Sequence, residues 1–263
     1  MTSGPYETIE FDVADTHVAT ITLNRPDRLN SFNQTMADEI SDAWGRVRDD
    51  DAIHSVVLRA NGDRAFCTGI DVKEGVWWYD RSIWNQEDPG SYLGPRRHQV
   101  WKPVVAAVNG MCAGGGQYFV NQCDIIICSD DAVFFDPHAN NGIVSALEPI
   151  GLLHRGMPLG DVLRWALLGN EERIGAETAL RLGIVTEVVP VDDLRDRARA
   201  IAESIARRRP VAIQGTVRAI WEAIEMPPAM ALQNGLLYTH IGNPMAPGEQ
   251  PARYDLGTDA EIR

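Results

Sequence analysis

The chain has 263 residues, of which 44% are hydrophobic and 23% are charged, proportions that are ordinary for a globular protein with a substantial core. Its net charge of −13 argues against nucleic acid as a partner, because a phosphate backbone is bound by excess positive charge. No run of about 18 apolar residues is present, and the N-terminus lacks the basic start and apolar middle of a secretory signal, so we expect no membrane partner and a cytoplasmic location.

The cysteines give no sign of a metal site or a disulfide. None of the four forms a C-x-x-C pair, and three of them lie in apolar stretches. This pattern is typical of free, buried thiols. We therefore predict buried thiols and no metal site at Cys67, Cys112, Cys123 and Cys128.

The first two thirds of the chain alternate between strand and helix patterns. A β-branched, alternating stretch predicts a strand over 17–24, and apolar residues at helical spacing predict a helix over 34–48 with Asn33 as its N-cap. Short apolar strands follow at 55–60, 103–110, 123–130 and 132–136. Strands that alternate with helices through short loops indicate an α/β domain whose strands are buried on both faces.

The pattern becomes helical after about residue 190. Three helices are predicted there, over 191–207, 211–225 and 228–240, with prolines between them. We therefore divide the chain into a core domain over 1–192 and a helical region over 193–263. The last 22 residues, from position 242, are rich in Pro, Gly and acidic residues, and we expect this tail to be loosely held.

Three consecutive glycines open an apolar helix in the sequence AGGGQY (113–118). Glycine has no Cβ atom and permits positive φ, so backbone N–H groups at this point can face a ligand. The phosphate-binding patterns G-x-x-x-x-G-K-[ST] and G-x-G-x-x-G after a strand are both missing. Unpaired N–H groups at a helix N-terminus suit a developing negative charge, as in an oxyanion hole. Close packing alone is an equally acceptable explanation of the glycines.

Several motifs in the same order make the chain resemble the crotonase (enoyl-CoA hydratase/isomerase) family over most of residues 15–225. The motifs are LNRPDRLNSFN (23–33), RAFCTGIDVKE (64–74), KPVVAAVNGMCAGGG (102–116), CDIIICSDDAVFFDP (123–137) and LLGNEERIGAETALRLGIVTEVVP (167–190). The resemblance implies a crotonase-like spiral of β-β-α units followed by a C-terminal helical oligomerisation region. It also implies a homotrimer, or a hexamer made of two trimers.

The same resemblance implies an acyl-CoA thioester as substrate and no separate cofactor, because coenzyme A is part of the substrate. The backbone N–H groups of Ile70 and Gly115 would form the oxyanion hole that holds the thioester oxygen. The CoA phosphates and adenine would lie near Arg25, Arg28, Arg64 and Lys73, although each of these could also be an ordinary solvated charge. Further substrate contacts are expected at Ala65, Gly69, Asp71 and Gly114.

The sequence departs from the family at its acidic positions. The two glutamates that the family's hydratases use correspond to Tyr118 and His138 here, and the acid that a dienoyl-CoA isomerase uses corresponds to Ala146. Tyrosine is a poor base at neutral pH, but it can donate a hydrogen bond. Histidine can both take and return a proton near neutral pH. We therefore assign proton transfer to His138, with Asp136 or Glu148 as the acid that orients it, and polarisation of the substrate to Tyr118.

These departures leave the reaction open. An enzyme with this site could catalyse a non-standard hydration, an isomerisation or the hydrolytic cleavage of a C–C bond. Loss of both glutamates is also what a catalytically inactive, acyl-CoA-binding homologue would show. The segment 74–101 carries six aromatic residues, which suit a broad acyl pocket or simple packing: Trp77, Trp78, Tyr79, Trp84, Tyr92 and Trp101.

Overall fold

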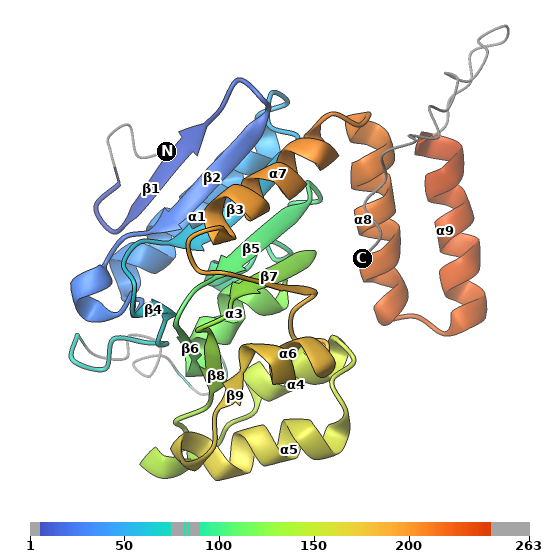
Figure 1. The fold of residues 1–263 in the computed structure, drawn as a ribbon. Helices are drawn as coiled ribbons and strands as arrows, with labels where there is room; N and C mark the ends of the chain where they lie inside the picture. The colour runs from blue at the N-terminus through green and yellow to red at the C-terminus, as the bar shows by residue number, and fades with distance from the viewer. Residues whose placement is uncertain (1–5, 75–81, 83, 85–89, 243–263) are drawn as a thin grey trace, which may run out of the picture.

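The computed structural model describes residues 6–74, 82, 84 and 90–242 (Figure 1). Three aromatic residues of the predicted acyl pocket, Trp77, Trp78 and Tyr79, lie outside these residues, and so does the predicted loose tail beyond residue 242. Within the described part of the chain, no helix combines the length and the hydrophobicity that crossing a bilayer requires.

Two sheets form the body of the molecule. Among the described residues, the larger sheet has six strands in the order β1-β2-β3-β5-β7-β10, and the smaller has four in the order β4-β6-β8-β9. The strands of the larger sheet are β1 (Ile9–Val13), β2 (Val18–Leu23), β3 (Ser55–Ala60), β5 (Val104–Val108), β7 (Ile125–Ser129) and β10 (Glu187–Val189). Those of the smaller sheet are β4 (Ala65–Cys67), β6 (Met111–Ala113), β8 (Val133–Phe135) and β9 (Ile174–Gly175).

From β3 to β8, successive strands belong alternately to the larger and the smaller sheet. β3, β5 and β7 pair in parallel in the larger sheet, and each is followed within a few residues by β4, β6 or β8 of the smaller sheet. The short helix α3 (Gln117–Asn121) follows β6 and completes one β-β-α unit. The α/β class predicted from the sequence is therefore confirmed, and the strands predicted in the first two thirds of the chain are present.

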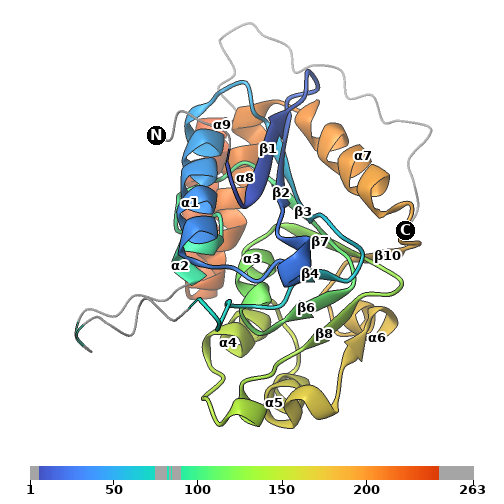
Figure 2. The same ribbon diagram turned by 90° about the vertical axis from the view of Figure 1, so that its left-hand side faces the viewer.

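Helices cover both faces of the larger sheet, which explains why its central strands are apolar throughout. Figure 2 shows α1 (Gln34–Asp49) and α7 (Leu194–Ala206) on opposite sides of the strands. In β5, Val105 and Ala107 belong to the cluster that packs on α7, whereas the alternate residues belong to the main core that includes α1. Asn33 caps α1 as predicted, because its side chain accepts a hydrogen bond of 3.0 Å from the Met36 amide.

Several shorter helices complete the body of the molecule. α4 (Leu147–His154), α5 (Leu159–Leu168) and α6 (Ala176–Arg181) lie beside the smaller sheet (Figure 1), together with the single 3₁₀ turns η4 (Ala139–Asn141) and η5 (Gly169–Glu171). The short helix α2 (Gly90–Leu93) precedes β5 in the chain. All four cysteines are free and buried, as predicted.

The last two helices form a hairpin that projects from the body (Figure 1). They are α8 (Pro210–Ile224) and α9 (Pro228–Gly242), and they pack mainly on each other. Trp221 joins α8 to the body by donating a 2.7 Å hydrogen bond to Asp124. α7 lies beyond the predicted boundary at residue 192 but packs on the larger sheet, whereas α8 and α9 pack mainly on each other.

Candidate active site

The first half of the site is the loop that leaves β4. The Phe32 amide donates to the Gly69 carbonyl over 2.9 Å, and the Asp71 amide donates to the Phe32 carbonyl over 2.8 Å. Because neighbouring residues in an extended chain direct their backbone groups to opposite sides, the N–H of Ile70 faces away from Phe32. Gly69 makes the tight turn before it, with a φ of +90° that favours glycine.

The second half is the triple glycine, which forms the 3₁₀ turn η3 (Gly114–Gly116) between β6 and α3. This turn lies directly against the first loop, since a Cβ atom on Gly115 would lie 3.4 Å from the Gly69 Cα. A Cβ on Gly116 would lie 2.4 Å from the Cys67 carbonyl oxygen, so close packing accounts for at least this glycine. The same close approach brings the loop of Ile70 beside Gly115.

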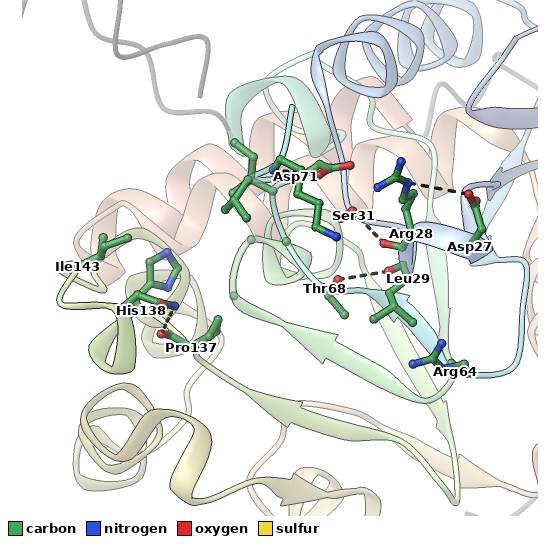
Figure 3. Close-up of a pocket in the computed structure, with 17 residues that line it drawn as sticks. Asp27, Arg28, Leu29, Ser31, Arg64, Thr68, Asp71, Pro137, His138 and Ile143 are labelled. Carbon is green, nitrogen blue, oxygen red and sulfur yellow. Dashed lines mark hydrogen bonds and ion pairs between the residues drawn. The ribbon is translucent and has the colours of Figure 1, made fainter. Parts of the chain in front are cut away.

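A cavity of about 640 Å³ opens over these two segments (Figure 3). Figure 3 shows His138 and Ile143 on one side of it, and Arg28, Leu29 and Thr68 on the other. Nine of the predicted site residues line this cavity: Arg28, Arg64, Gly69, Ile70, Asp71, Lys73, Gly114, Gly115 and His138.

His138 is held over the glycine turn by a buried carboxylate. A Cβ atom on Gly114 would lie 3.5 Å from the ring atom Cε1 of His138. The Asp136 side chain is fully buried, and its Oδ1 accepts a 3.0 Å hydrogen bond from the His138 amide and another from the ring Nδ1–H. Ser145 donates to the other oxygen of Asp136. Asp136 therefore fixes the orientation of the ring. It also leaves Nε2 as the ring nitrogen that faces away from the carboxylate.

These contacts set the protonation states of the pair. Burial alone would raise the pKa of Asp136, but the hydrogen bonds from His138 and Ser145 outweigh it and lower that pKa. The hydrogen bond to Asp136 raises the pKa of His138, although burial of the ring acts against this. The imidazolium form of His138 is therefore more abundant at neutral pH than in a solvated histidine.

Glu148 faces the opposite side of the ring. Its Oε1 lies 3.7 Å from His138 Nε2, and its side chain is almost completely buried in the first turn of α4. Burial raises the pKa of Glu148, while the charge of His138 and a hydrogen bond from Tyr118 partly offset this effect. Among the described residues, the cavity lining includes neither Glu148 nor Tyr118.

Both acids that the sequence offers as partners of His138 thus contact it, one at each ring nitrogen. The sequence indicates Glu148 only by its place ten residues after His138. The loop and the 3₁₀ turn between the two residues determine where α4 begins, and therefore where Glu148 lies. The Tyr118–Glu148 hydrogen bond joins α3 to α4, and no local pattern indicates it.

Among the described residues, the lining of the cavity does not include two predicted substrate contacts, Arg25 and Ala65. Arg25 is mostly buried, and its guanidinium donates to the Ser31 carbonyl at 2.6 Å and forms ion pairs with Asp71 at 3.1 Å and Glu74 at 2.5 Å. These contacts tie down the loop that carries Ile70. Ala65 is buried in β4. Their contact with CoA remains a prediction.

Comparisons with known proteins agree with this architecture. A profile of the enoyl-CoA hydratase/isomerase family matches residues 14–238. The chain is 35% identical over 225 residues to (E)-benzylidenesuccinyl-CoA hydratase of Thauera aromatica, an overlap of 86% of this chain and 85% of that protein. It is 32% identical to mevalonyl-coenzyme A hydratase of Aspergillus fumigatus, over 80% of this chain and 77% of that protein.

Solved structures show the same fold. The crystal structure of an enoyl-CoA hydratase/isomerase from Mycobacterium paratuberculosis matches with a TM-score of 0.82 at 37% identity, covering 89% of this chain and 90% of that one. An enoyl-CoA hydratase from Bacillus anthracis matches with a TM-score of 0.78 at 28% identity, over 89% and 90% of the two chains. The predicted crotonase-like fold is confirmed, and the chain belongs to the enoyl-CoA hydratase/isomerase family, whose members act on acyl-CoA thioesters.

Proposed function

We propose that this protein adds water to the double bond of an α,β-unsaturated acyl-CoA, or removes it from the corresponding 3-hydroxyacyl-CoA. The N–H groups of Ile70 and Gly115 hold the thioester oxygen, on which negative charge develops as water attacks the β-carbon. His138 then gives a proton to the α-carbon of the resulting enolate. Two preorganised N–H donors at such an oxygen typically contribute several kcal/mol of transition-state stabilisation, since removing one donor costs about 3 kcal/mol.

The observation that carries this proposal is the position of His138. Its ring lies beside Gly114 and lines the same cavity as Ile70 and Gly115, so a thioester oxygen on the two N–H groups would place its α-carbon near the imidazole. The raised pKa of His138 favours the protonated ring that this role requires. The names of several relatives support the reaction class, because they describe hydratases and, in Proteus mirabilis, a carnitinyl-CoA dehydratase.

Basic residues at the cavity support the choice of a CoA ester. Arg28, Arg64 and Lys73 are exposed and line the cavity, although the chain as a whole is strongly acidic. A local group of cations in an acidic protein favours an anionic ligand at that place, such as the phosphates of CoA. Coenzyme A enters as part of the substrate in this proposal, and no separate cofactor takes part.

A substrate panel tests the proposal. Purified protein would be incubated with crotonyl-CoA, with aryl and cyclic enoyl-CoA esters, and with β-diketo acyl-CoA esters. The masses of the products would be measured by mass spectrometry. Addition of one water to an enoyl-CoA is the expected result. A product of unchanged mass that separates from the substrate on chromatography would indicate isomerisation, and two fragments from a β-diketone would indicate C–C hydrolysis.

Binding measurements distinguish the remaining alternative. Calorimetry with butyryl-CoA, which has no double bond to hydrate, reports binding without turnover. Tight binding of butyryl-CoA without reaction of any ester in the panel would favour a catalytically inactive, acyl-CoA-binding homologue.

A further inference from the structure

We propose that Glu148 is the second proton-transfer group of this site, and that Glu148 and His138 hold the reacting water between them. This inference rests on the proposed hydration. By the family resemblance, Tyr118 and His138 occupy the positions of the hydratase glutamates, whereas Glu148 contacts His138 from α4, a different part of the chain. The carboxylate would act as the base for water while the imidazolium acts as the acid for the α-carbon.

The separation of the two groups is the first support. Nε2 of His138 and Oε1 of Glu148 lie 3.7 Å apart, which is too long for a direct hydrogen bond. One water can contact both atoms across such a gap. Because Nδ1 is occupied by Asp136, Nε2 is the ring nitrogen that remains for the water and the substrate.

The second support is the way in which the Glu148 carboxylate is held. Its side chain is almost fully buried, and Tyr118 donates a hydrogen bond to it from α3. Asn121, one turn further along α3, donates a 3.1 Å hydrogen bond to the Glu148 carbonyl. A carboxylate in the first turn of a helix is also stabilised by the helix dipole. These contacts keep a charged base in place at a buried position, where an unheld carboxylate would be costly.

The protonation states agree with the assigned roles. Burial raises the pKa of Glu148, which makes it a stronger base than a solvated carboxylate, and the Asp136 hydrogen bond raises the pKa of His138. Within the described part of the chain, the Asp136 carboxylate and the Tyr118 hydroxyl face the pair. The raised pKa of His138 favours its imidazolium form, and the charge of His138 together with the Tyr118 hydrogen bond favours the carboxylate form of Glu148 against the effect of burial.

The reaction balances with these two groups. Glu148 takes a proton from water as the water oxygen forms its bond to the β-carbon, and the electrons of the C=C bond move to the thioester oxygen. The enolate then collapses, and its α-carbon takes the proton from Nε2 of His138. Glu148 is left protonated and His138 neutral, and transfer of this proton from Oε1 to Nε2 through one water restores the starting state.

The test separates water addition from proton transfer at the α-carbon. Exchange of the α-hydrogens of butyryl-CoA in D₂O needs only the oxyanion hole and His138, whereas hydration of crotonyl-CoA also needs Glu148. We expect Glu148→Gln to lower hydration by about 100-fold or more and to retain α-hydrogen exchange. The matched control is Glu177→Gln, because Glu177 is an exposed glutamate in the first turn of α6 and should retain both activities.

A second variant keeps the inference testable if Glu148→Gln folds poorly. Tyr118→Phe removes a hydrogen bond that lowers the pKa of Glu148, so the loss of hydration at acidic pH should begin at a higher pH than in the wild type. Equal losses of hydration and exchange in Glu148→Gln, or hydration that is unchanged, would overturn the role of Glu148. Loss of hydration at the same acidic pH in Tyr118→Phe and in the wild type would also overturn the role of Glu148. Absence of hydration of every enoyl-CoA ester by the wild type would instead refute the proposed function itself.

Discussion

The backbone of Gly69 lies so close to Gly115 that a Cβ atom on Gly69 would be 3.1 Å from the Gly115 amide nitrogen. This contact brings together the two segments that would supply the oxyanion hole. An alanine at position 69 would crowd the N–H of Gly115 and would also have to adopt a φ of +90°. We expect Gly69→Ala to lower kcat by about 100-fold, the typical effect of losing one oxyanion donor.

Gly45 provides the matched control for this prediction. It lies within α1, and a Cβ atom there would meet nothing within 4 Å. Gly45→Ala should leave kcat unchanged and raise the free energy of unfolding by about 0.5–1 kcal/mol, because alanine favours a helix interior. Steady-state kinetics and denaturant unfolding measure both effects. A wild-type kcat in folded Gly69→Ala would argue against the oxyanion role of this contact.

Asp136 should determine the basic limb of the pH profile. In the hydration direction the reaction needs the imidazolium form, so activity falls as pH rises through the pKa of His138, which lies above its ordinary value. Asp136→Asn removes the anion that stabilises this form, and the limb should move to lower pH by about one unit or more. The profile of kcat/KM with pH measures the shift.

The control for this variant is Asp130→Asn, because Asp130 is exposed and lies just after β7. Its pH profile should match that of the wild type. A lower rate with an unmoved basic limb in Asp136→Asn would mean that Asp136 orients the ring but does not raise the pKa of His138. That result would contradict the electrostatic role of Asp136.

Arg64 and Lys73 should contribute to the binding of CoA through charge. Each is exposed at the cavity, so we expect its replacement by alanine to raise the Kd for butyryl-CoA by about fivefold, equivalent to about 1 kcal/mol. The dependence of Kd on salt should also weaken. Arg181→Ala, at an exposed position on α6, should bind as the wild type does. Calorimetry that shows an unchanged Kd and salt dependence in both cavity variants would exclude this electrostatic site.

The C-terminal hairpin should mediate assembly. Leu232 and Leu237 on α9 are 78% and 61% exposed, and Ile220 on α8 is 60% exposed, which would be costly on a monomer in water. We predict a homotrimer or a hexamer made of two trimers, and expect Leu232→Glu to shift it toward monomer while Leu232→Met does not. Sedimentation analysis gives the masses. A monomeric wild type would contradict the prediction.

The sequence predicted those parts of the structure that local pattern determines. Continuous apolar runs identified β3, β5 and β7, because these strands are buried on both faces, and helical spacing with an Asn33 cap identified α1. The motif position of His138 likewise predicted a residue that lines the cavity.

Contacts between distant segments could not be predicted in the same way. Arg25 is predicted to lie near the CoA phosphates, and no local pattern indicates its ion pairs with Asp71 and Glu74, which lie 46 and 49 residues further along the chain. The position of Glu148 relative to His138 depends on a left-handed Gly142 and on where α4 begins, and its pairing with Tyr118 depends on how α3 packs on α4. Such contacts arise from tertiary packing, and the periodicity of the local sequence does not predict them.

The reaction of crotonyl-CoA in D₂O tests the central claim most directly, with wild-type protein compared with His138→Gln. The predicted product is 3-hydroxybutyryl-CoA with one deuterium at the α-carbon, formed about 100-fold or more slowly by His138→Gln. The control His154→Gln, at an exposed histidine in the last turn of α4, should react at the wild-type rate. Formation of the same deuterated product by His138→Gln at the wild-type rate would contradict the claim that His138 transfers the α-proton.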